Sequence, residues 1–124
     1  MEFSSRRLAD VVIAAPVGRV DHASAEDFRA SLAPLLDHCS EGVDRVVLDF
    51  PGVEYISSVG LRVLMLAAKQ VKAQKGVIVI AAMQPVVKEI FDISRFNYVF
   101  AAFSGVREAV SDLSIQAAAL FDAT

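Results

Sequence analysis

Two adjacent serines, Ser57 and Ser58, stand in the stretch "YISSVGLRVL", where a buried-looking segment gives way to a helix-like one. A serine at a helix start can cap the helix, attack a substrate or receive a phosphate. Helix beginnings leave backbone N–H groups unpaired and carry partial positive charge, so they attract phosphate and carboxylate groups. Gly60, in the first turn, is expected to keep side-chain bulk away from whatever approaches there. Because one hydroxyl suffices for a cap, the second hydroxyl needs another explanation.

Nucleophilic catalysis by either serine has little support. A nucleophile elbow has glycine two residues before the serine, but Ile56 precedes Ser58 in that way and Tyr55 precedes Ser57. His22, which follows a predicted strand, could approach the serines as a base, whereas His38 is expected at a solvated helix end. The sequence also has no glycine-rich phosphate loop ending in Lys-Ser or Lys-Thr. We therefore expect no catalytic residues and no enzymatic activity.

The length of 124 residues predicts one domain, residues 1–124, with a core at about 8–115. Although 55% of the residues are hydrophobic, the uncharged run "GVIVIAAMQPVV" is shorter than the roughly 18 to 20 residues of a membrane span, and Pro85 interrupts it. The opening residues lack the apolar region of a secretory signal. We expect a cytoplasmic protein that does not associate with membranes.

Charge and cysteine content exclude further classes of function. The formal net charge is −3, and the basic residues are scattered, so we expect no nucleic-acid partner. Cys39 is the single cysteine and cannot form an internal disulfide. Without neighbouring cysteines or paired histidines there is no structural zinc pattern. We expect no metal and no cofactor.

Four segments are predicted as strands. The segment "ADVVIAAPVGRV" is broken in its second half by Pro16 and Gly18, as in an edge strand or a bent one. "DRVVLDF" and "GVIVIAA" are continuous apolar runs, which suit parallel strands buried on both faces. "PGVEY" is predicted as a turn, and "YVFAAF" contains the last strand.

Helices are predicted between these strands. Asp21 offers an N-cap for a first helix near residues 22–38, and the serine pair begins a central helix that ends before Gly76. A short helix starts at Pro85 and a last one at about Ser104. The alternating order predicts an α/β fold with a mixed, mostly parallel sheet of four to five strands, about four helices and right-handed crossovers.

The central helix has two apolar sides. At 100° per residue, one side should pack on the sheet; it carries Leu61, Leu64, Met65, Ala68 and Val71. The other side carries Val59, Val63 and Leu66 beside the polar Arg62. Either a neighbouring helix covers these three apolar residues, or they form a docking surface that starts at the serines.

The chain resembles the STAS domain family, specifically its stand-alone bacterial anti-sigma factor antagonists. The resemblance rests on "GRVD" before the first helix, on "VVLDFPGVEYISSVGLRVL", and on "PVVKEIFDISRFNYVF". It implies a protein that binds, when unphosphorylated, an anti-sigma factor that is also a serine kinase, and so releases the client sigma factor. It further implies phosphorylation at the start of the central helix, which ends binding, and reversal by a PP2C-type phosphatase.

By position, the resemblance places the acceptor on Ser58, with Ser57 as the local cap or spacer, and the family's acidic residue on Asp21. The commonest family pattern has an aspartate before the acceptor and a second serine after it, where this chain has Ser57 and Val59. A STAS module that senses a ligand or builds a scaffold without being phosphorylated is the alternative, and a small serine hydrolase or nucleotide-binding protein is a further one. The predicted partner-binding residues are Asp21, Ser57, Ser58, Val59, Gly60, Arg62, Val63 and Leu66.

Overall fold

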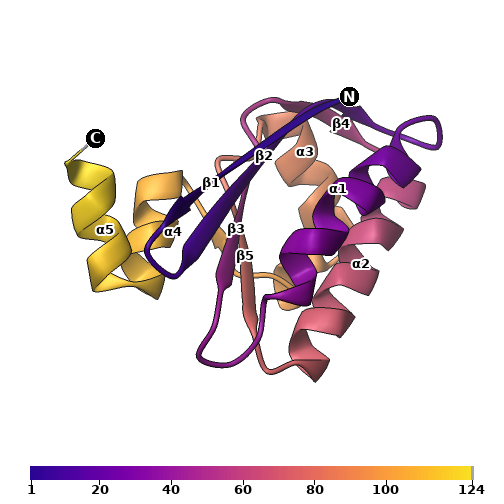
Figure 1. Ribbon diagram of the computed structural model, residues 1–124. Coiled ribbons are helices and arrows are strands. Elements are labelled where there is room, and N and C mark those ends of the chain that lie inside the picture. Colours follow the sequence, from indigo (N-terminus) through magenta and orange to yellow (C-terminus); the bar gives the residue numbers. More distant parts are fainter. Residues whose placement is uncertain (124) are drawn as a thin grey trace.

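The computed structural model describes residues 1–123, which form one mixed sheet with helices on both faces (Figure 1). The strands are β1 (Glu2–Leu8), β2 (Val11–Val20), β3 (Arg45–Asp49), β4 (Val53–Ile56), β5 (Val77–Ala81) and β6 (Ala102–Phe103). The helices are α1 (Ala25–Asp37), α2 (Ser58–Ala73), α3 (Pro85–Ile93), α4 (Val106–Leu113) and α5 (Ile115–Asp122), with a 3₁₀ turn, η1, at Phe96–Tyr98.

The sheet has the order β1-β2-β3-β5-β6, and β4 pairs with the far half of β2. β1 is antiparallel to β2, and every other pairing is parallel. The α/β class and the mostly parallel sheet are therefore confirmed. The predicted number of strands was too low, since the sheet has six, and five α-helices stand where about four were expected.

Two strands were missed. The sequence of β1, EFSSRRL, contains no apolar run, and most of its side chains are exposed. β1 is an antiparallel edge strand that pairs with β2 from Glu2 opposite Val17 to Leu8 opposite Val11. β4 has only four residues, in a segment for which the sequence predicts a turn. Both strands depend on pairing with β2 more than on their own sequence.

β2 is bent, as predicted, but it is not an edge strand. Its first half pairs with β3, from Val11 to Ala14, and its last residues pair with β4 after a register shift between Gly18 and Arg19. Gly18 has φ of +117°, which side-chain-bearing residues rarely adopt. β2 thus connects two parallel pairings and carries the chain to the serine-containing edge.

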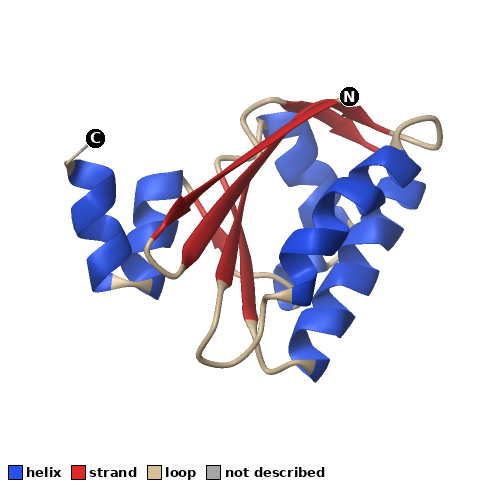
Figure 2. Ribbon diagram, viewed as in Figure 1, coloured by secondary structure: helices blue, strands red, loops and turns tan. Residues whose placement is uncertain are grey.

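The helices form two layers, with α1, α2 and α3 on one face of the sheet and α4 and α5 on the other (Figure 2). The first face buries the larger apolar cluster, which includes Phe28, Phe50, Leu64 and Phe91. The second cluster lies under α4 and α5 and includes Ala109, Val110 and Ala117. β1 and α5, which contact each other, extend the packed unit beyond the predicted core at 8–115.

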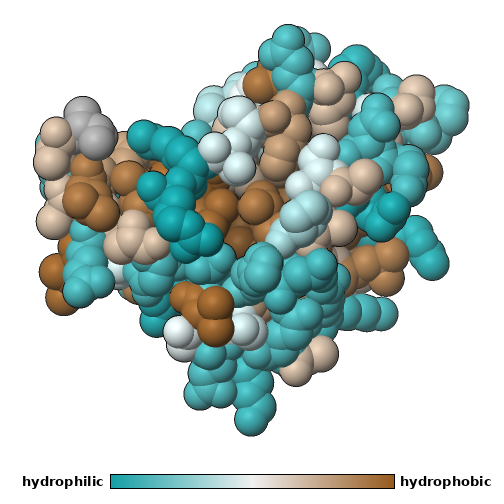
Figure 3. All heavy atoms as spheres, in the orientation of Figure 1, coloured by the Kyte–Doolittle hydropathy of each residue, from teal (hydrophilic) through white to brown (hydrophobic). Residues whose placement is uncertain are grey.

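The C-terminal helix predicted from about Ser104 is two helices. Ser114 has extended backbone angles, and its hydroxyl accepts a hydrogen bond from the Ala117 N–H at 3.1 Å, so it ends α4 and caps α5. Brown side chains lie over α4 and α5, and others lie near the middle of the same face (Figure 3). Ile115, at the start of α5, is 89% exposed. No helix within residues 1–123 is long and apolar enough to cross a membrane.

Candidate functional site

The serine pair lies at the carboxyl ends of β2 and β4. These strands are parallel, and Val20 lies opposite Ile56, so Asp21 and Ser57 both follow the last paired residues. The backbone N–H of Ser57 donates to the carbonyl oxygen of Val20 at 2.8 Å. The "GRVD" segment therefore ends beside the serines, and ligands of open α/β sheets commonly bind at this kind of edge.

Ser57 is the N-cap of α2. Its hydroxyl oxygen accepts a hydrogen bond from the Gly60 N–H at 3.3 Å, and its carbonyl oxygen accepts one from the Leu61 N–H at 2.9 Å. The capping role predicted for one serine is confirmed. In the first turn, the N–H groups of Ser58 and Val59 have no intrahelical acceptor, which leaves two donors and the positive end of the helix dipole facing outward.

Ser58 is the first residue of α2 and is exposed. Its hydroxyl forms no side-chain hydrogen bond with any of the residues that the structure describes. The two serines therefore differ in kind, since one hydroxyl supports the helix and the other is available to solvent or to a partner.

Gly60 was predicted to keep side-chain bulk away from an approaching molecule, but the missing side chain makes room for the protein's own β2. Gly60 is buried, and a Cβ built on it would lie 2.7 Å from Val20 Cγ1, 2.8 Å from Ile56 Cγ1 and 2.9 Å from the carbonyl oxygen of Val20. Glycine is needed because the end of β2 and the first turn of α2 touch, and no space is left there for an incoming molecule. The absence of a side chain at Gly60 thus lets the first turn of α2, with its serines, pack closely on the end of β2.

Asp21 was predicted as the N-cap of α1, but the helix starts four residues later with Ser24 at the N-cap. Asp21 instead organises the preceding turn: its carboxylate accepts hydrogen bonds from the Ala23 N–H at 3.1 Å and the Ser24 N–H at 3.3 Å. Partial desolvation would raise the pKa of Asp21, but these bonds, the Ser24 hydroxyl and the charge of Arg19 together lower it. The carboxylate is therefore ionised and partly exposed beside the serine edge.

A neighbouring helix, α1, covers the second apolar side of α2 only in part. α1 packs against α2 and half-buries Val63, which lines a hollow of 150 Å³ between the two helices. Leu66 lines the same hollow but remains 48% exposed, Val59 is 43% exposed, and Arg62 is exposed as well. We define the α2 ridge as Ser58, Val59, Arg62 and Leu66.

Arg19 and Tyr55 belong to the same edge and were not predicted. They are paired across β2 and β4, and the Arg19 guanidinium lies 4.6 Å from the centre of the Tyr55 ring and 3.8 Å from an Asp21 carboxylate oxygen. The ring and the carboxylate fix a cation next to the start of α2. Arg19 stands in the quoted "GRVD", so a signal was present in the sequence.

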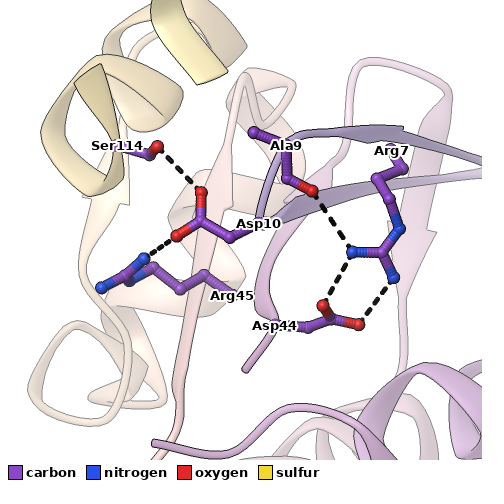
Figure 4. A network of polar contacts seen from close by, with 6 residues as sticks. All are labelled: Arg7, Ala9, Asp10, Asp44, Arg45 and Ser114. Atoms are coloured by element: carbon purple, nitrogen blue, oxygen red, sulfur yellow. Dashed lines mark hydrogen bonds and ion pairs between the residues drawn. The ribbon is translucent and has the colours of Figure 1, made fainter. Parts of the chain in front are cut away.

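A second polar cluster lies at the opposite end of the sheet, where β2 and β3 begin (Figure 4). Asp10 forms an ion pair with Arg45 and accepts a hydrogen bond from the Ser114 hydroxyl at 2.9 Å. Arg7 holds Asp44 with two bonds of 2.7 and 2.8 Å, and this contact lowers the pKa of the buried Asp44 carboxyl. Sequence reasoning did not find this cluster.

The arrangement of side chains at the serine edge suits binding rather than catalysis. Neither the His22 nor the His38 imidazole forms a hydrogen bond with Ser57 or Ser58 in the described part of the chain, so Ser58 has no base there. The described residues contain no group of three or more His, Cys, Asp or Glu side chains placed to hold a metal ion. An exposed hydroxyl, two outward N–H groups and an apolar ridge suit a protein contact that a phosphate can change.

Comparison with known proteins shows the family to which the chain belongs. The chain is 40% identical over 100 residues to the protein named "Putative anti-sigma factor antagonist BtrV" of Bordetella bronchiseptica, with 81% of this chain and 84% of BtrV covered. The fold is similar to the crystal structure of TM1081 from Thermotoga maritima, with a TM-score of 0.80, 20% identity, and 89% and 92% of the two chains covered.

The fold is also similar to that of the anti-sigma factor antagonist SpoIIAA. The unphosphorylated form gives a TM-score of 0.72 at 18% identity, covering 90% of this chain and 96% of SpoIIAA; the phosphorylated form, from Bacillus, gives 0.68 at 17%, covering 91% and 100%. The family model described as the STAS domain matches residues 2–109. The matched residues extend from β1 to the middle of α4. This protein therefore belongs to the STAS domain family.

Proposed function

We propose that this protein is an anti-sigma factor antagonist that switches partners through phosphorylation of Ser58. In the unphosphorylated form it binds an anti-sigma factor, which then releases its sigma factor. The anti-sigma factor is also the serine kinase, and a PP2C-type phosphatase restores the binding form. The protein acts by binding and catalyses no reaction of its own.

The observation that carries this proposal is the difference between the two serine hydroxyls. Ser57 is engaged with the Gly60 N–H, whereas Ser58 is exposed and makes no side-chain hydrogen bond in the described chain. A phosphate adds about 1.5 to 2 negative charges, which the N-terminus of a helix tolerates. The fold can therefore survive modification, while a partner packed over the same spot would meet a new charge.

The partner is proposed to contact the α2 ridge together with Asp21 and the half-buried Val63. Val59 and Leu66 offer apolar area, and Arg62 and Asp21 offer one charge of each sign. Ser57 and Gly60, which were also predicted to touch the partner, act here by setting the start of α2. A charge introduced into such a contact costs affinity because it is desolvated without a counterion.

Partner capture with and without ATP tests the proposal. An extract of the source cells is passed over the immobilised protein, and the chain is then analysed by intact mass and phosphopeptide sequencing. We expect one added phosphate, lost in Ser58→Ala and retained in Ser57→Ala. Phosphate on Ser57, or full modification of Ser58→Ala, would contradict the assignment.

Binding of the captured anti-sigma factor is then measured by calorimetry. Ser58→Ala should bind like the original chain, and Ser58→Asp should bind about a hundredfold more weakly. Leu66→Asp should also weaken binding, and Leu120→Asp is its matched control, because Leu120 is 47% exposed on α5 across the sheet. Equal affinities of the two leucine variants would remove the α2 ridge from the contact.

A further inference from the structure

The outer edge of β5 is left open over part of its length. β5 pairs with β3 through all five of its residues but with β6 only through Ile80 and Ala81. The Ile80 N–H donates outward to the carbonyl oxygen of Ala101 at 3.1 Å. Backbone groups alternate in direction along a parallel strand, so the N–H and C=O of Ile78 also point outward. No strand among residues 1–123 pairs with Ile78 on that side.

A groove of 460 Å³ runs beside this open edge. It is bounded by the last turns of α2, by β5, and by the residues that follow and end η1. Several of its apolar side chains are exposed to water, with Val77 at 38%, Val99 at 39% and Tyr98 at 82%. An unpaired strand edge next to apolar pockets is the arrangement to which extended peptides add as a further strand.

The charge around the groove has one sign. Lys69 and Lys72 line it, and its lining contains no Asp or Glu. Neither lysine forms an ion pair with another residue in the described part of the chain. Two uncompensated ammonium groups beside an apolar strip favour a ligand that alternates apolar and acidic side chains.

We propose that this groove is a second docking site, which binds an extended, acidic segment of a partner protein as a strand added to β5. Ile78 exchanges backbone hydrogen bonds with that segment. Alternate apolar side chains of the segment contact Val77 and Tyr98, and its carboxylates pair with Lys69 and Lys72.

The β5 groove is separate from the serine edge. Lys72 lies fourteen positions after Ser58 on α2, which at 1.5 Å per residue is about 20 Å along the helix axis. A segment in the groove therefore does not cover Ser58, and both contacts can form on one molecule. The site does not rest on the proposed phosphorylation, so either proposal can fail without the other.

A designed peptide serves as the probe. It alternates valine with glutamate and has blocked ends, and its counterpart carries lysine in place of each glutamate. Binding is followed by NMR titration of the isotope-labelled protein. We expect the acidic peptide to shift the Ile78 amide signal and slow its hydrogen exchange, and the basic peptide to leave both unchanged.

The matched variants are Lys72→Glu and Lys75→Glu. They change the charge equally near the end of α2, but Lys75 lines a different hollow. We expect Lys72→Glu to weaken acidic-peptide binding by about tenfold and Lys75→Glu to change it much less. No response of Ile78 at millimolar peptide, equal binding of the two peptides, or equal weakening by the two variants would overturn the site.

Discussion

The two ends of the central strands use their polar side chains differently. Where β2 and β3 begin, Asp10 bonds Arg45 and Ser114, and Asp44 bonds Arg7, so each carboxylate is engaged within the chain. Where β2 and β4 end, the Ser58 hydroxyl has no such partner in the described chain. Polar groups that satisfy one another stabilise a fold, whereas groups that face outward without partners are available for recognition.

The residues that stabilise the fold and those available for binding thus lie at opposite ends of the sheet. The engaged end joins β1, the turn between β1 and β2, β3 and the start of α5 through bonds between their own side chains. At the serine end, Ser57 and Gly60 hold the first turn of α2 in place, whereas the α2 ridge, with Ser58 at its start, is exposed to solvent. Substitutions at the two ends should therefore differ in whether they change unfolding or binding.

The largest expected effect tests whether the serine end depends on the core beneath it. Leu64 is fully buried under α2, so Leu64→Ala should lower the free energy of unfolding by about 2 to 5 kcal/mol. Leu66→Ala, on the half-exposed side of the same helix, should cost less than about 1 kcal/mol. Urea denaturation measures both, and similar losses would show that the two sides of α2 are not distinct.

The next effect concerns the contact between α2 and β2. Gly60→Ala places a methyl group against the Val20 backbone and two side chains, so it should cost about 1 to 3 kcal/mol of stability. Gly105→Ala is the control, because the nearest atoms to its added methyl belong to the flexible Glu108 carboxylate. If thermal unfolding gave the two variants equal shifts, Gly60 would have no special part in seating the serines.

A smaller, pH-dependent effect is expected at the engaged end. Asp44→Asn removes the buried carboxylate held by Arg7 and should cost about 1 to 2 kcal/mol at neutral pH, discounted because Arg7 is partly exposed. The pKa of Asp44 is lowered in the folded protein, chiefly by its hydrogen bonds with Arg7. Its contribution is thus present above the unfolded pKa of about 4 and is lost as the pH falls through the lower folded value.

Unfolding of the original chain and of Asp44→Asn should therefore differ at about pH 7 and converge as the pH falls below the lowered pKa that Asp44 has in the folded protein. Asp112→Asn is the control, since Asp112 is exposed and outside the ion pairs found in the described residues. A constant difference between the original chain and Asp44→Asn over the whole range would mean that the charge of Asp44 does not stabilise the fold.

The sequence predicted the serine end better than the engaged end, and the reason is locality. The N-cap of α2 depends on Ser57 and on Gly60 three residues later, and the end of that helix is marked by the nearby Gly76. By contrast, the Asp10 carboxylate meets Arg45 35 positions later and Ser114 104 positions later. No spacing rule connects such residues before the topology is known.

The missed strands have a related cause. β1 has neither alternating apolar residues nor an apolar run, and its place in the sheet comes from pairing with β2, which was predicted.

The prediction for Gly60 named the wrong neighbour, and the reason is also physical. The sequence indicated that bulk was excluded from this turn, but whether a partner or the chain's own β2 required the space was decided by packing alone.

The smallest expected effects are those of substitutions in the serine pair, which compare a serine bonded within the chain with an exposed one. Ser57→Ala removes the acceptor for the Gly60 N–H and should lower the free energy of unfolding by about 1 kcal/mol, the usual cost of a lost cap. Ser58→Ala removes an exposed hydroxyl that has no partner in the described chain and should change stability by less than about 0.5 kcal/mol. Both are measured on the unphosphorylated protein by urea denaturation, where two neighbouring substitutions of the same kind serve as controls for each other. A loss at Ser58 equal to that at Ser57 would mean that both hydroxyls support the helix, and the serine end would then resemble the engaged end.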